Sequence, residues 1–156
     1  MIHWIGNGGH AKACKDVANA MGQYLCGTFV AVGDNAARRR EALAAENARF
    51  DILIYPYAAI SPSATIGYGT VVMEGAVVQA GAVIGEHVIV NAGAVITHDC
   101  IIEDYAHIAP GAHLCGGVHV GEGALVGVGV GIEPGVQIPA WSVVKRAPYV
   151  ITLADH

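Results

Sequence analysis

The chain has few charged and few aromatic residues. Charged residues make up 13% of its 156 residues and aromatic residues 6%, whereas a typical soluble domain has about 25% charged residues. Yet 54% of the residues are hydrophobic, and the mean hydropathy of +0.48 argues against intrinsic disorder. No stretch of about 18 apolar residues is free of Gly, His or charge, so we expect no membrane span. Glycine does not recur at every third position, which excludes collagen.

The few charges are unevenly distributed along the chain. Residues 1–58 contain six Lys or Arg and five Asp or Glu, for a net charge of +1, whereas residues 59–156 contain two and eight, for −6. An acidic body is a poor electrostatic match for a phosphate backbone, so we expect no nucleic-acid partner.

The cysteines and the first residues bear on the compartment. The four cysteines form no CxxC pair, so we expect free thiols in a reducing environment. The N-terminus MIHWIGNGGH lacks the basic region and the long apolar region of a signal peptide. Both features favour a cytoplasmic protein. The cysteines are Cys14, Cys26, Cys100 and Cys115.

A period of six residues runs from residue 60 to residue 144. Every sixth position is aliphatic, fifteen times in succession and without an insertion. Four positions after each aliphatic a small or β-branched residue recurs, and the position before that is most often Gly. This period is neither that of a helix nor that of an alternating strand. The aliphatic positions are Ile60, Ile66, Val72, Val78, Ile84, Val90, Ile96, Ile102, Ile108, Leu114, Val120, Val126, Ile132, Ile138 and Val144.

This repeat has a direct structural interpretation. A short strand followed by a tight turn, repeated many times, builds a prism whose interior receives one aliphatic side chain per side. The turn needs a residue that tolerates positive φ, which glycine does without steric cost. The pattern therefore predicts a parallel β-solenoid of about five coils over residues 59–144, followed by a tail over residues 145–156.

Residues 1–58 show a different pattern. Strands are predicted over residues 2–5, 28–32 and 51–55, with helices over residues 11–21 and 36–47. This βαβαβ order indicates a small, Rossmann-like parallel sheet, and Asp34 and Asn35 are suited to cap the second helix. The run Arg38, Arg39 and Arg40 is expected to form a mostly solvated helix face.

The loop between the first strand and the first helix has a nucleotide-binding pattern. Gly6-Asn7-Gly8-Gly9-His10-Ala11 fits G-x-G-x-x-G/A, and Asp34 follows about twenty residues later. Such glycines let a phosphate approach the N-terminus of a helix. The segment is too short for a complete dinucleotide domain, so a mononucleotide or a nucleotide sugar fits better. A simple packing turn between strand and helix is the alternative.

Five of the eight histidines fall between residues 87 and 119. His107, His113 and His119 occupy the same place in successive hexads, so they lie on three different sides of a coil and cannot jointly bind a metal; we expect no metal site. His98 stands beside Asp99, which replaces the usual Gly. Because His107 is half a coil further on, the two rings can share a site only between subunits, which predicts an oligomer, most simply a threefold ring.

The order of these motifs resembles a known family of enzymes. GNGGHAK, GDNAARRR, the hexads, Asn91, Thr97-His98-Asp99 and His107-Ile108-Ala109-Pro110 follow one another as in the hexapeptide-repeat acyltransferases. Within that family the chain is most similar to the bacillosamine-pathway nucleotide-sugar N-acetyltransferases and their sialic acid O-acetyltransferase relatives. The resemblance implies a left-handed path for the β-helix and a homotrimer. The N-terminal domain is shorter than in those relatives, which leaves the recognition of the nucleobase open.

The resemblance also implies roles for individual residues. His98 corresponds to the general base, Asp99 supports it, and His107 and Asn91 lie near the thioester of acetyl-CoA, which runs in the groove between adjacent prisms. The N-terminal domain holds the nucleotide sugar. The expected substrate contacts are Gly6, Asn7, Gly8, Gly9, His10, Asp34, Asn35 and Asn91, and the expected CoA contacts are Gly116, Gly117, Lys145 and Arg146.

These observations predict an acetyl-CoA-dependent N-acetyltransferase that acts on the amine of a nucleotide-linked amino sugar by direct attack. The sequence leaves three alternatives: O-acetylation of a sugar or sialic acid hydroxyl, a non-catalytic nucleotide-binding trimer, and a metal-dependent hydratase on the same fold. For His98 and His107 the corresponding alternative is an ordinary surface histidine.

Overall fold

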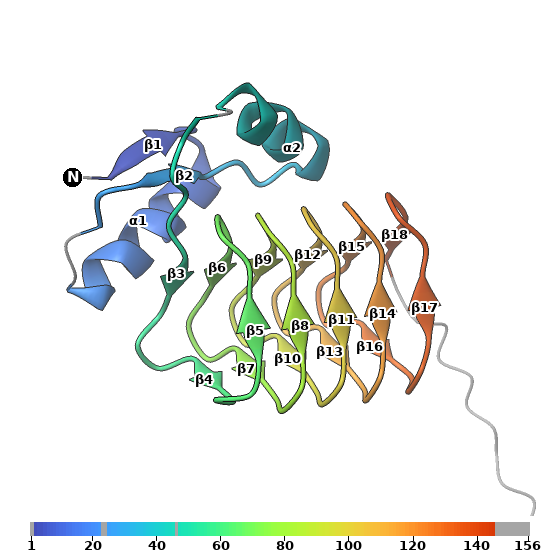
Figure 1. The fold of residues 1–156 in the computed structure, drawn as a ribbon. Coiled ribbons are helices and arrows are strands. Elements are labelled where there is room, and N and C mark those ends of the chain that lie inside the picture. The colour runs from blue at the N-terminus through green and yellow to red at the C-terminus, as the bar shows by residue number, and fades with distance from the viewer. Residues whose placement is uncertain (1, 23–24, 46, 146–156) are drawn as a thin grey trace, which may run out of the picture.

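The computed structural model describes residues 2–22, 25–45 and 47–145. Figure 1 shows a parallel β-solenoid with a small α/β unit seated on its N-terminal half. The unit contains β1 (His3–Ile5), α1 (Gly9–Met21), β2 (Thr28–Val30) and α2 (Asn35–Ala44). Neither of these helices is both long and apolar enough to cross a bilayer, as judged over the described ranges.

The solenoid is a triangular prism with three parallel sheets. The β4–β16 sheet contains β4 (Ala59–Ile60), β7 (Val77–Val78), β10 (Val95–Ile96), β13 (His113–Leu114) and β16 (Gly131–Ile132). The β5–β17 sheet contains β5 (Thr65–Ile66), β8 (Val83–Ile84), β11 (Ile101–Ile102), β14 (His119–Val120) and β17 (Gln137–Ile138). The β3–β18 sheet contains β3 (Leu53–Ile54), β6 (Val71–Val72), β9 (Ile89–Val90), β12 (His107–Ile108), β15 (Leu125–Val126) and β18 (Val143–Val144).

The six-residue period predicts the core of the prism correctly. The second residue of each strand points inward, and all fifteen predicted aliphatic side chains lie in one continuous core. Only Ile60, Ile66 and Val144, near the two ends, are partly exposed. Each strand pairs with the strand one coil away, for example Val95 with Val77 and with His113. The predicted solenoid of about five coils is therefore confirmed.

The three edges of the prism are turns in which one residue has positive φ. One edge, the glycine corner, uses only glycine. A second edge, the Asp99 corner, includes one aspartate, and the third, the aromatic corner, includes three ring-bearing residues. The glycine corner consists of Gly75, Gly93, Gly111 and Gly129, the Asp99 corner of Gly81, Asp99, Gly117 and Gly135, and the aromatic corner of Gly69, His87, Tyr105, Gly123 and Trp141.

The N-terminal unit differs from the predicted βαβαβ arrangement in its last strand. β1 and β2 form a two-stranded parallel sheet. On the other side of β2, Thr28 makes a single parallel bridge with Phe50. β3 instead pairs with β6 of the solenoid, so its assignment to the N-terminal sheet is wrong. The physical reason is that Ile54 lies six residues before Ile60 and packs against the prism core. The domain boundary between residues 58 and 59 stays a prediction, with β3 on the solenoid sheet.

The helices have the predicted places but different ends. α1 begins at Gly9, two residues earlier than expected, and its C-cap is Gly22 with φ 59°. α2 begins at Asn35 and ends at Ala44, short of the predicted end at residue 47. Asp34 caps α2 as expected, because its Oδ1 accepts from the backbone N–H of Ala37 at 2.7 Å.

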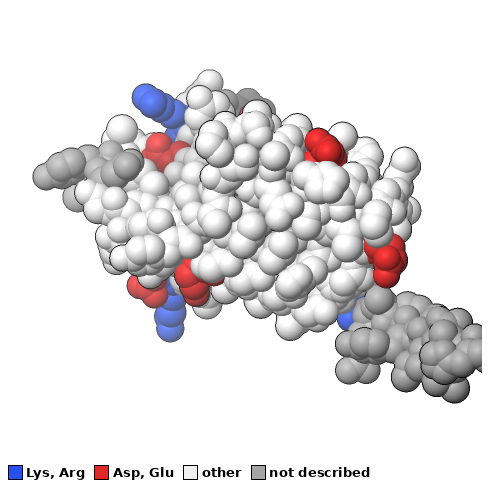
Figure 2. All heavy atoms as spheres, turned by 90° about the horizontal axis from the view of Figure 1, so that it is seen from below, with Lys and Arg blue, Asp and Glu red and all other residues white. Residues whose placement is uncertain are grey.

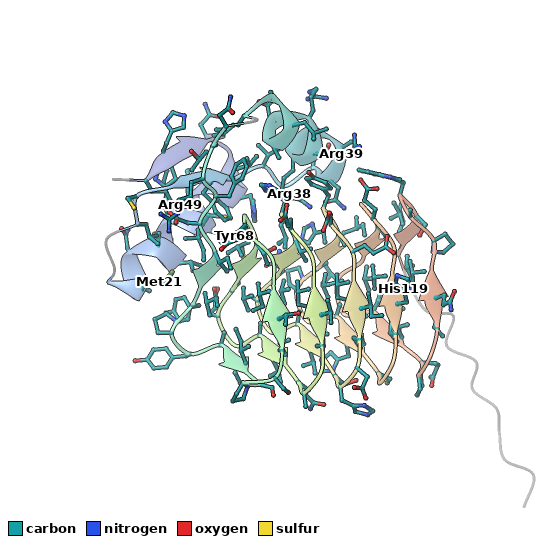
Figure 3. The ribbon with its side chains drawn as sticks, in the orientation of Figure 1. Met21, Arg38, Arg39, Arg49, Tyr68 and His119 are labelled. Atoms are coloured by element: carbon teal, nitrogen blue, oxygen red, sulfur yellow. The ribbon has the colours of Figure 1, made fainter. Side chains whose placement is uncertain are left out.

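α1 holds the unit on the solenoid through a second apolar core. Ala11, Cys14 and Val17 of α1 are buried in one cluster with Leu53 and Ile89 of the β3–β18 sheet. α2 makes the other contact, through Arg38, whose side chain is 1% exposed. Figure 3 shows Arg38 between α2 and the coils. The expected solvated face is therefore wrong for Arg38, while Arg39 and Arg40 are exposed.

Candidate functional site

His98 and Asp99 form an exposed pair at the turn between β10 and β11. The His98 Nδ1 and the Asp99 Oδ2 are 2.8 Å apart, and the two side chains are 63% and 72% exposed. Asp99 has φ 59°, a conformation that aspartate tolerates better than most residues. Because the carboxylate accepts a hydrogen bond from Nδ1–H, the neutral ring has its lone pair on Nε2. The pair therefore presents an oriented imidazole that can accept a proton.

Glycines in the neighbouring coils provide the space for this pair. A Cβ at Gly81 would lie 2.6 Å from the Asp99 Oδ1, and a Cβ at Gly116 would lie 2.6 Å from the His98 Cε1 and 2.7 Å from its Nε2. Gly116, an expected CoA contact, thus lies against the His98 ring. Gly117 follows it and donates its N–H to the carbonyl of His98 at 3.0 Å.

An open groove begins at His98. Its volume is about 490 Å³, within the range of ligand sites. The groove extends across β4 and β7, and its walls are mostly small and apolar. The lining residues besides His98 are Ala59, Ile60, Ser61, Val78, Gln79 and Ala80. An oriented base thus stands beside a surface that suits an aliphatic chain.

His107 lies on a different sheet, at the start of β12. The Asn91 Nδ2 is 3.1 Å from the His107 Nε2, and the Asn91 Oδ1 accepts from the N–H of Ala92 at 2.9 Å. The amide oxygen is thereby engaged, so the amide nitrogen donates to Nε2 and the ring carries its proton on Nδ1. Burial, followed by the nearby charge of Arg38, lowers the pKa of His107 to about 4. The ring is therefore neutral at pH 7.

His10 lies close to His107, in the first turn of α1. The Cys14 Sγ is 3.4 Å from the His10 Nε2. Burial, followed by the charge of Arg38, lowers the pKa of His10 to about 4, and burial raises that of the Cys14 thiol to about 12. The fold thus brings His10, Asn91 and His107 into one neutral, polar cluster. It places His98 and Asp99 at another edge of the prism, so one chain contains two separate parts of the predicted site.

The glycine loop is open on its outer side. A Cβ at Gly8 or Gly9 would meet no atom within 4 Å, and no side chain caps α1. The N–H groups of the first helical turn are therefore available to an anion. Gly6 has φ 110°, and a Cβ there would lie 2.7 Å from the Ala31 carbonyl oxygen. This close approach explains why glycine is needed where the loop leaves β1.

A hollow of about 460 Å³ lies beside the loop, between β1 and α2. Two predicted substrate contacts, Gly6 and Asn7, are in its wall. Its other lining residues are Trp4, Ile5, Val32, Ala37 and Glu41. The hollow lies at the carboxyl ends of the parallel strands, where α/β units commonly bind ligands.

Two other predicted substrate contacts have structural partners. Asp34 caps α2. The Asn35 Nδ2 donates to the carbonyls of Gly123 at 3.0 Å and Ala124 at 3.3 Å, and its Oδ1 accepts from the Arg38 Nη2 at 2.9 Å. Asn35 therefore docks the start of α2 on the solenoid, and its contact with substrate stays a prediction.

Arg38 is the main residue of this region that the sequence analysis missed. Its guanidinium donates to backbone carbonyls of both units, and burial lowers its pKa to about 10, so it is charged at neutral pH. Among the described residues it has no ion pair. Its acceptors are the carbonyls of Val32, Gly33, His87, Tyr105 and Ala106, and the Oδ1 of Asn35.

The aromatic corner beneath Arg38 was also missed. His87 is 2% exposed and stacks in parallel on Tyr105 with ring centroids 5.4 Å apart. Phe50 packs edge-on against it at 4.5 Å. Arg39 lies over the Tyr105 ring at 5.9 Å and pairs with Glu122 at 3.0 Å. The signal was available, since His87 and Tyr105 replace the hexad glycine as Asp99 does.

The remaining expected contacts lie at the C-terminal end. Lys145 is exposed just after β18, and Arg146 lies outside the described residues. Within residues 2–22, 25–45 and 47–145, no three His, Cys, Asp or Glu side chains are grouped as a metal cluster would require.

Comparisons with known proteins identify this architecture. Residues 81–116 match the family model described as bacterial transferase hexapeptide (six repeats). No curated protein sequence matches the chain. Among solved structures, WeeI from Acinetobacter baumannii AYE has a TM-score of 0.72 at 17% identity, over 95% of this chain and 97% of that chain, which shows the fold alone.

Two other solved structures are similar in sequence as well. The acetyltransferase domain of PglB from Neisseria gonorrhoeae FA1090, in complex with acetyl coenzyme A, is 35% identical over 93% of this chain and 87% of that chain, with a TM-score of 0.88. PerB from Caulobacter crescentus, in complex with CoA and GDP-perosamine, is 34% identical over 93% and 88%, with a TM-score of 0.85. The chain therefore belongs to the hexapeptide-repeat acyltransferases, the left-handed β-helix family that includes the nucleotide-amino-sugar N-acetyltransferases.

Proposed function

We propose that the chain transfers an acetyl group from acetyl-CoA to the amine of a nucleotide-linked amino sugar, by direct attack at a subunit interface of a homotrimer. The observation that carries this proposal is the exposed His98–Asp99 pair at 2.8 Å beside an apolar groove. Similarity supports it, because PglB binds acetyl coenzyme A and PerB binds CoA and GDP-perosamine.

His98 acts as the general base. A sugar amine is largely protonated at neutral pH and must lose a proton before its lone pair can attack a carbonyl. The Nε2 of His98 takes this proton, and the Asp99 carboxylate stabilises the resulting imidazolium through Nδ1–H. The C–N bond forms, the C–S bond of the thioester breaks, and the imidazolium returns the proton to the departing CoA thiolate. General-base assistance of this kind contributes about 10²- to 10⁴-fold to the rate.

His107 acts as a hydrogen-bond donor to the carbonyl oxygen under attack. Asn91 fixes the ring with its proton on Nδ1. Negative charge develops on the carbonyl oxygen in the transition state, and a fixed donor in a site that excludes water stabilises it. His98 and His107 thus take different parts of one acyl transfer.

The distance between these two groups in the fold requires a second subunit. His98 lies at the Asp99 corner, and His107 lies on the β3–β18 sheet. A neighbouring prism that brings its own β3–β18 sheet to the Asp99 corner completes the site. Figure 2 supports such packing, because the side seen there has charged residues only near its margins. The outward residues of β4, β7 and β10 on this side are Ala59, Val77 and Val95.

The two substrates take separate regions in this proposal. The groove at His98, with Gly116 and Gly117, receives the pantetheine arm of CoA, and Lys145 and Arg146 face its phosphates. The glycine loop Gly6–Gly9 and His10 hold the diphosphate of the nucleotide sugar, with Asp34 on the ribose side.

The test is release of free CoA with a panel of UDP-, dTDP- and GDP-linked amino sugars. We expect turnover with at least one of them and a product that keeps its acetyl group in hydroxylamine, as an amide does and an ester does not. The His98→Ala variant should lose about 10²- to 10⁴-fold in kcat, and the His3→Ala variant, altered at an exposed position of β1, should not. Turnover that survives His98→Ala removes the base assignment, and an ester product indicates an O-acetyltransferase.

A further inference from the structure

The hollow between β1 and α2 has one feature that the proposed function does not use. Its wall includes the side chain of Glu41, which makes no hydrogen bond or ion pair with any of the described residues. Ala37 and Glu41 are one helical turn apart and so lie on the same face of α2, opposite Trp4 and Ile5 of β1. An unpartnered carboxylate thus borders a space large enough for a nucleobase.

The position of the hollow relative to the glycine loop determines which part of a nucleotide it can hold. Gly6 and Asn7 are in its wall, so a diphosphate on the loop has its nucleoside next to the hollow. Asp34, the N-cap of α2 four residues after β2, is close to the position that contacts the ribose in nucleotide-binding α/β units. Glu41 is seven residues further along, about 10 Å along the helix axis. The group beyond the ribose is the base, and Glu41 is placed to meet it.

Trp4 and Glu41 contribute differently to the recognition of a base. The Trp4 ring packs edge-on against Phe29 at 5.9 Å and lies under the Lys15 Nζ at 5.7 Å, so it gives the hollow an apolar wall and selects no base. A carboxylate only accepts hydrogen bonds, and it does so best from two adjacent donors. Guanine alone among the common bases has two adjacent donors on its pairing edge, N1–H and N2–H. Uracil and thymine have a single N3–H between two carbonyl oxygens, which a carboxylate repels.

We infer that Glu41 selects a guanine nucleotide, so that the amino-sugar substrate is a GDP-sugar. This inference rests on the proposed function, because it names the substrate class of the same site. It also gives the shortened N-terminal domain a means of base recognition that uses only β1 and α2. Glu41 is a specificity-determining residue in this account and takes no part in the chemical step.

The experiment is calorimetric titration of the full-length protein with GDP, UDP and dTDP. We expect GDP to bind about 10- to 100-fold more tightly than the other two, the range for one bidentate base contact. Glu41→Gln should abolish this difference by weakening GDP, because an amide has a single acceptor oxygen for the two donors of guanine, and it should not weaken UDP, because an amide does not repel the carbonyl oxygens of uracil. Glu133→Gln, at an exposed turn of the last coils, is the matched control and should leave all three affinities unchanged.

The possible outcomes separate this inference from the proposed function. Equal affinities, or tighter binding of UDP or dTDP, overturn the guanine assignment and leave nucleotide-sugar binding intact. An equal loss for all three nucleotides in Glu41→Gln shows that Glu41 contacts the ribose, which also overturns it. If no nucleotide binds while acetyl-CoA does, the nucleotide-sugar part of the proposed function fails as well. If the Glu41→Gln variant does not fold, the Glu41→Asp variant and the ranking of the three nucleotide affinities in the wild-type protein test the inference instead.

Discussion

The glycine corner and the other two corners of the prism have the same positive-φ turns but use different residues in them. Each turn needs one residue with positive φ, which glycine adopts freely and which costs other residues about 1 kcal/mol or more. The glycine corner uses Gly75, Gly93, Gly111 and Gly129. In the Asp99 corner and the aromatic corner, four residues other than glycine adopt positive φ despite its conformational free energy. They are Asp99, His87, Tyr105 and Trp141.

The difference marks the positions of the solenoid that orient the proposed base or dock the N-terminal unit. Asp99 orients His98, and the His87 and Tyr105 carbonyls and rings receive Arg38 and Arg39 of α2. Trp141 packs where a Cβ at Gly123 would stand, next to the Gly123 carbonyl that receives Asn35. Each non-glycine residue with positive φ is thus next to the proposed base or to the docked N-terminal unit. The glycine corner also borders the docked unit, because Met73 and Ala92 at its turns pack in the cluster of α1, but it contains neither the proposed base nor an acceptor for α2.

The largest effect should come from filling the space beside His98. Gly116→Ala puts a methyl group where the His98 ring lies, and the ring, as the end of a flexible side chain, moves away. We expect kcat to fall by about 10²- to 10⁴-fold, the whole general-base contribution, with little change in the melting temperature. Gly131→Ala is the control, because its Cβ would meet no atom within 4 Å. Full activity in Gly116→Ala would show that the observed ring position is not the catalytic one.

Removing Arg38 should separate the aromatic corner from α2. Arg38→Met deletes every hydrogen bond between this guanidinium and the buried carbonyls of both units. Because those carbonyls lose their partner, we expect the free energy of unfolding to fall by about 3 kcal/mol. Arg40→Met changes an exposed neighbour on the same helix and should have little effect. Urea denaturation of the two variants measures the difference, and equal losses would contradict the docking role.

Converting the Asp99 corner into a second glycine corner should change activity and stability in opposite directions. Asp99→Gly removes the partner of His98 and relieves the positive-φ cost, so we expect kcat to fall by less than the general-base contribution of about 10²- to 10⁴-fold and stability to rise by up to about 1 kcal/mol. Tyr105→Gly, the equivalent change at the aromatic corner, should instead lower stability, because Tyr105 stacks on His87. Steady-state kinetics and thermal melting test both variants, and an unchanged kcat in Asp99→Gly would remove its proposed role.

The architecture of the solenoid was predictable because it depends on a local repeat. Each aliphatic at the sixth position needs only the neighbouring coil to be buried, so the period identifies the core from Ile60 to Val144. The period was nevertheless begun one step too late. Ile54 and Ala58 continue it toward the N-terminus, and this extension would have assigned β3 to the solenoid.

The candidate site was only partly predictable because it depends on contacts between distant segments. The pairing of His98 with Asp99 is adjacent in sequence and was expected. The burial of Arg38 was not, because its acceptors are backbone carbonyls of Tyr105 and Ala106, which no side-chain pattern reveals. The hollow that contains Glu41 likewise forms only when α2 packs beside β1.

The smallest predicted effect concerns protonation at the aromatic corner. Burial and the charge of Arg38 lower the pKa of His87 to about 4, against a partial opposite effect of Asp104. His10 and His107 are lowered to about 4 as well. The unfolded chain, with a histidine pKa of about 6.5, therefore binds more protons than the folded one between pH 6.5 and 4. Stability is full above this window and falls as the pH drops through it.

His87→Phe isolates the contribution of this corner. Phenylalanine keeps the stack on Tyr105 and cannot be protonated. Only two of the three buried histidines, His10 and His107, then take up a proton on unfolding at low pH. We expect the slope of unfolding free energy against pH, measured by urea denaturation between pH 6.5 and 4.5, to decrease by up to about 1.4 kcal/mol per pH unit. His3→Phe changes an exposed histidine and should leave the slope unchanged. If His87→Phe also leaves it unchanged, the buried ring is accessible to protons in the folded state, and the aromatic corner opens more readily than its packing on Phe50 and Tyr105 indicates.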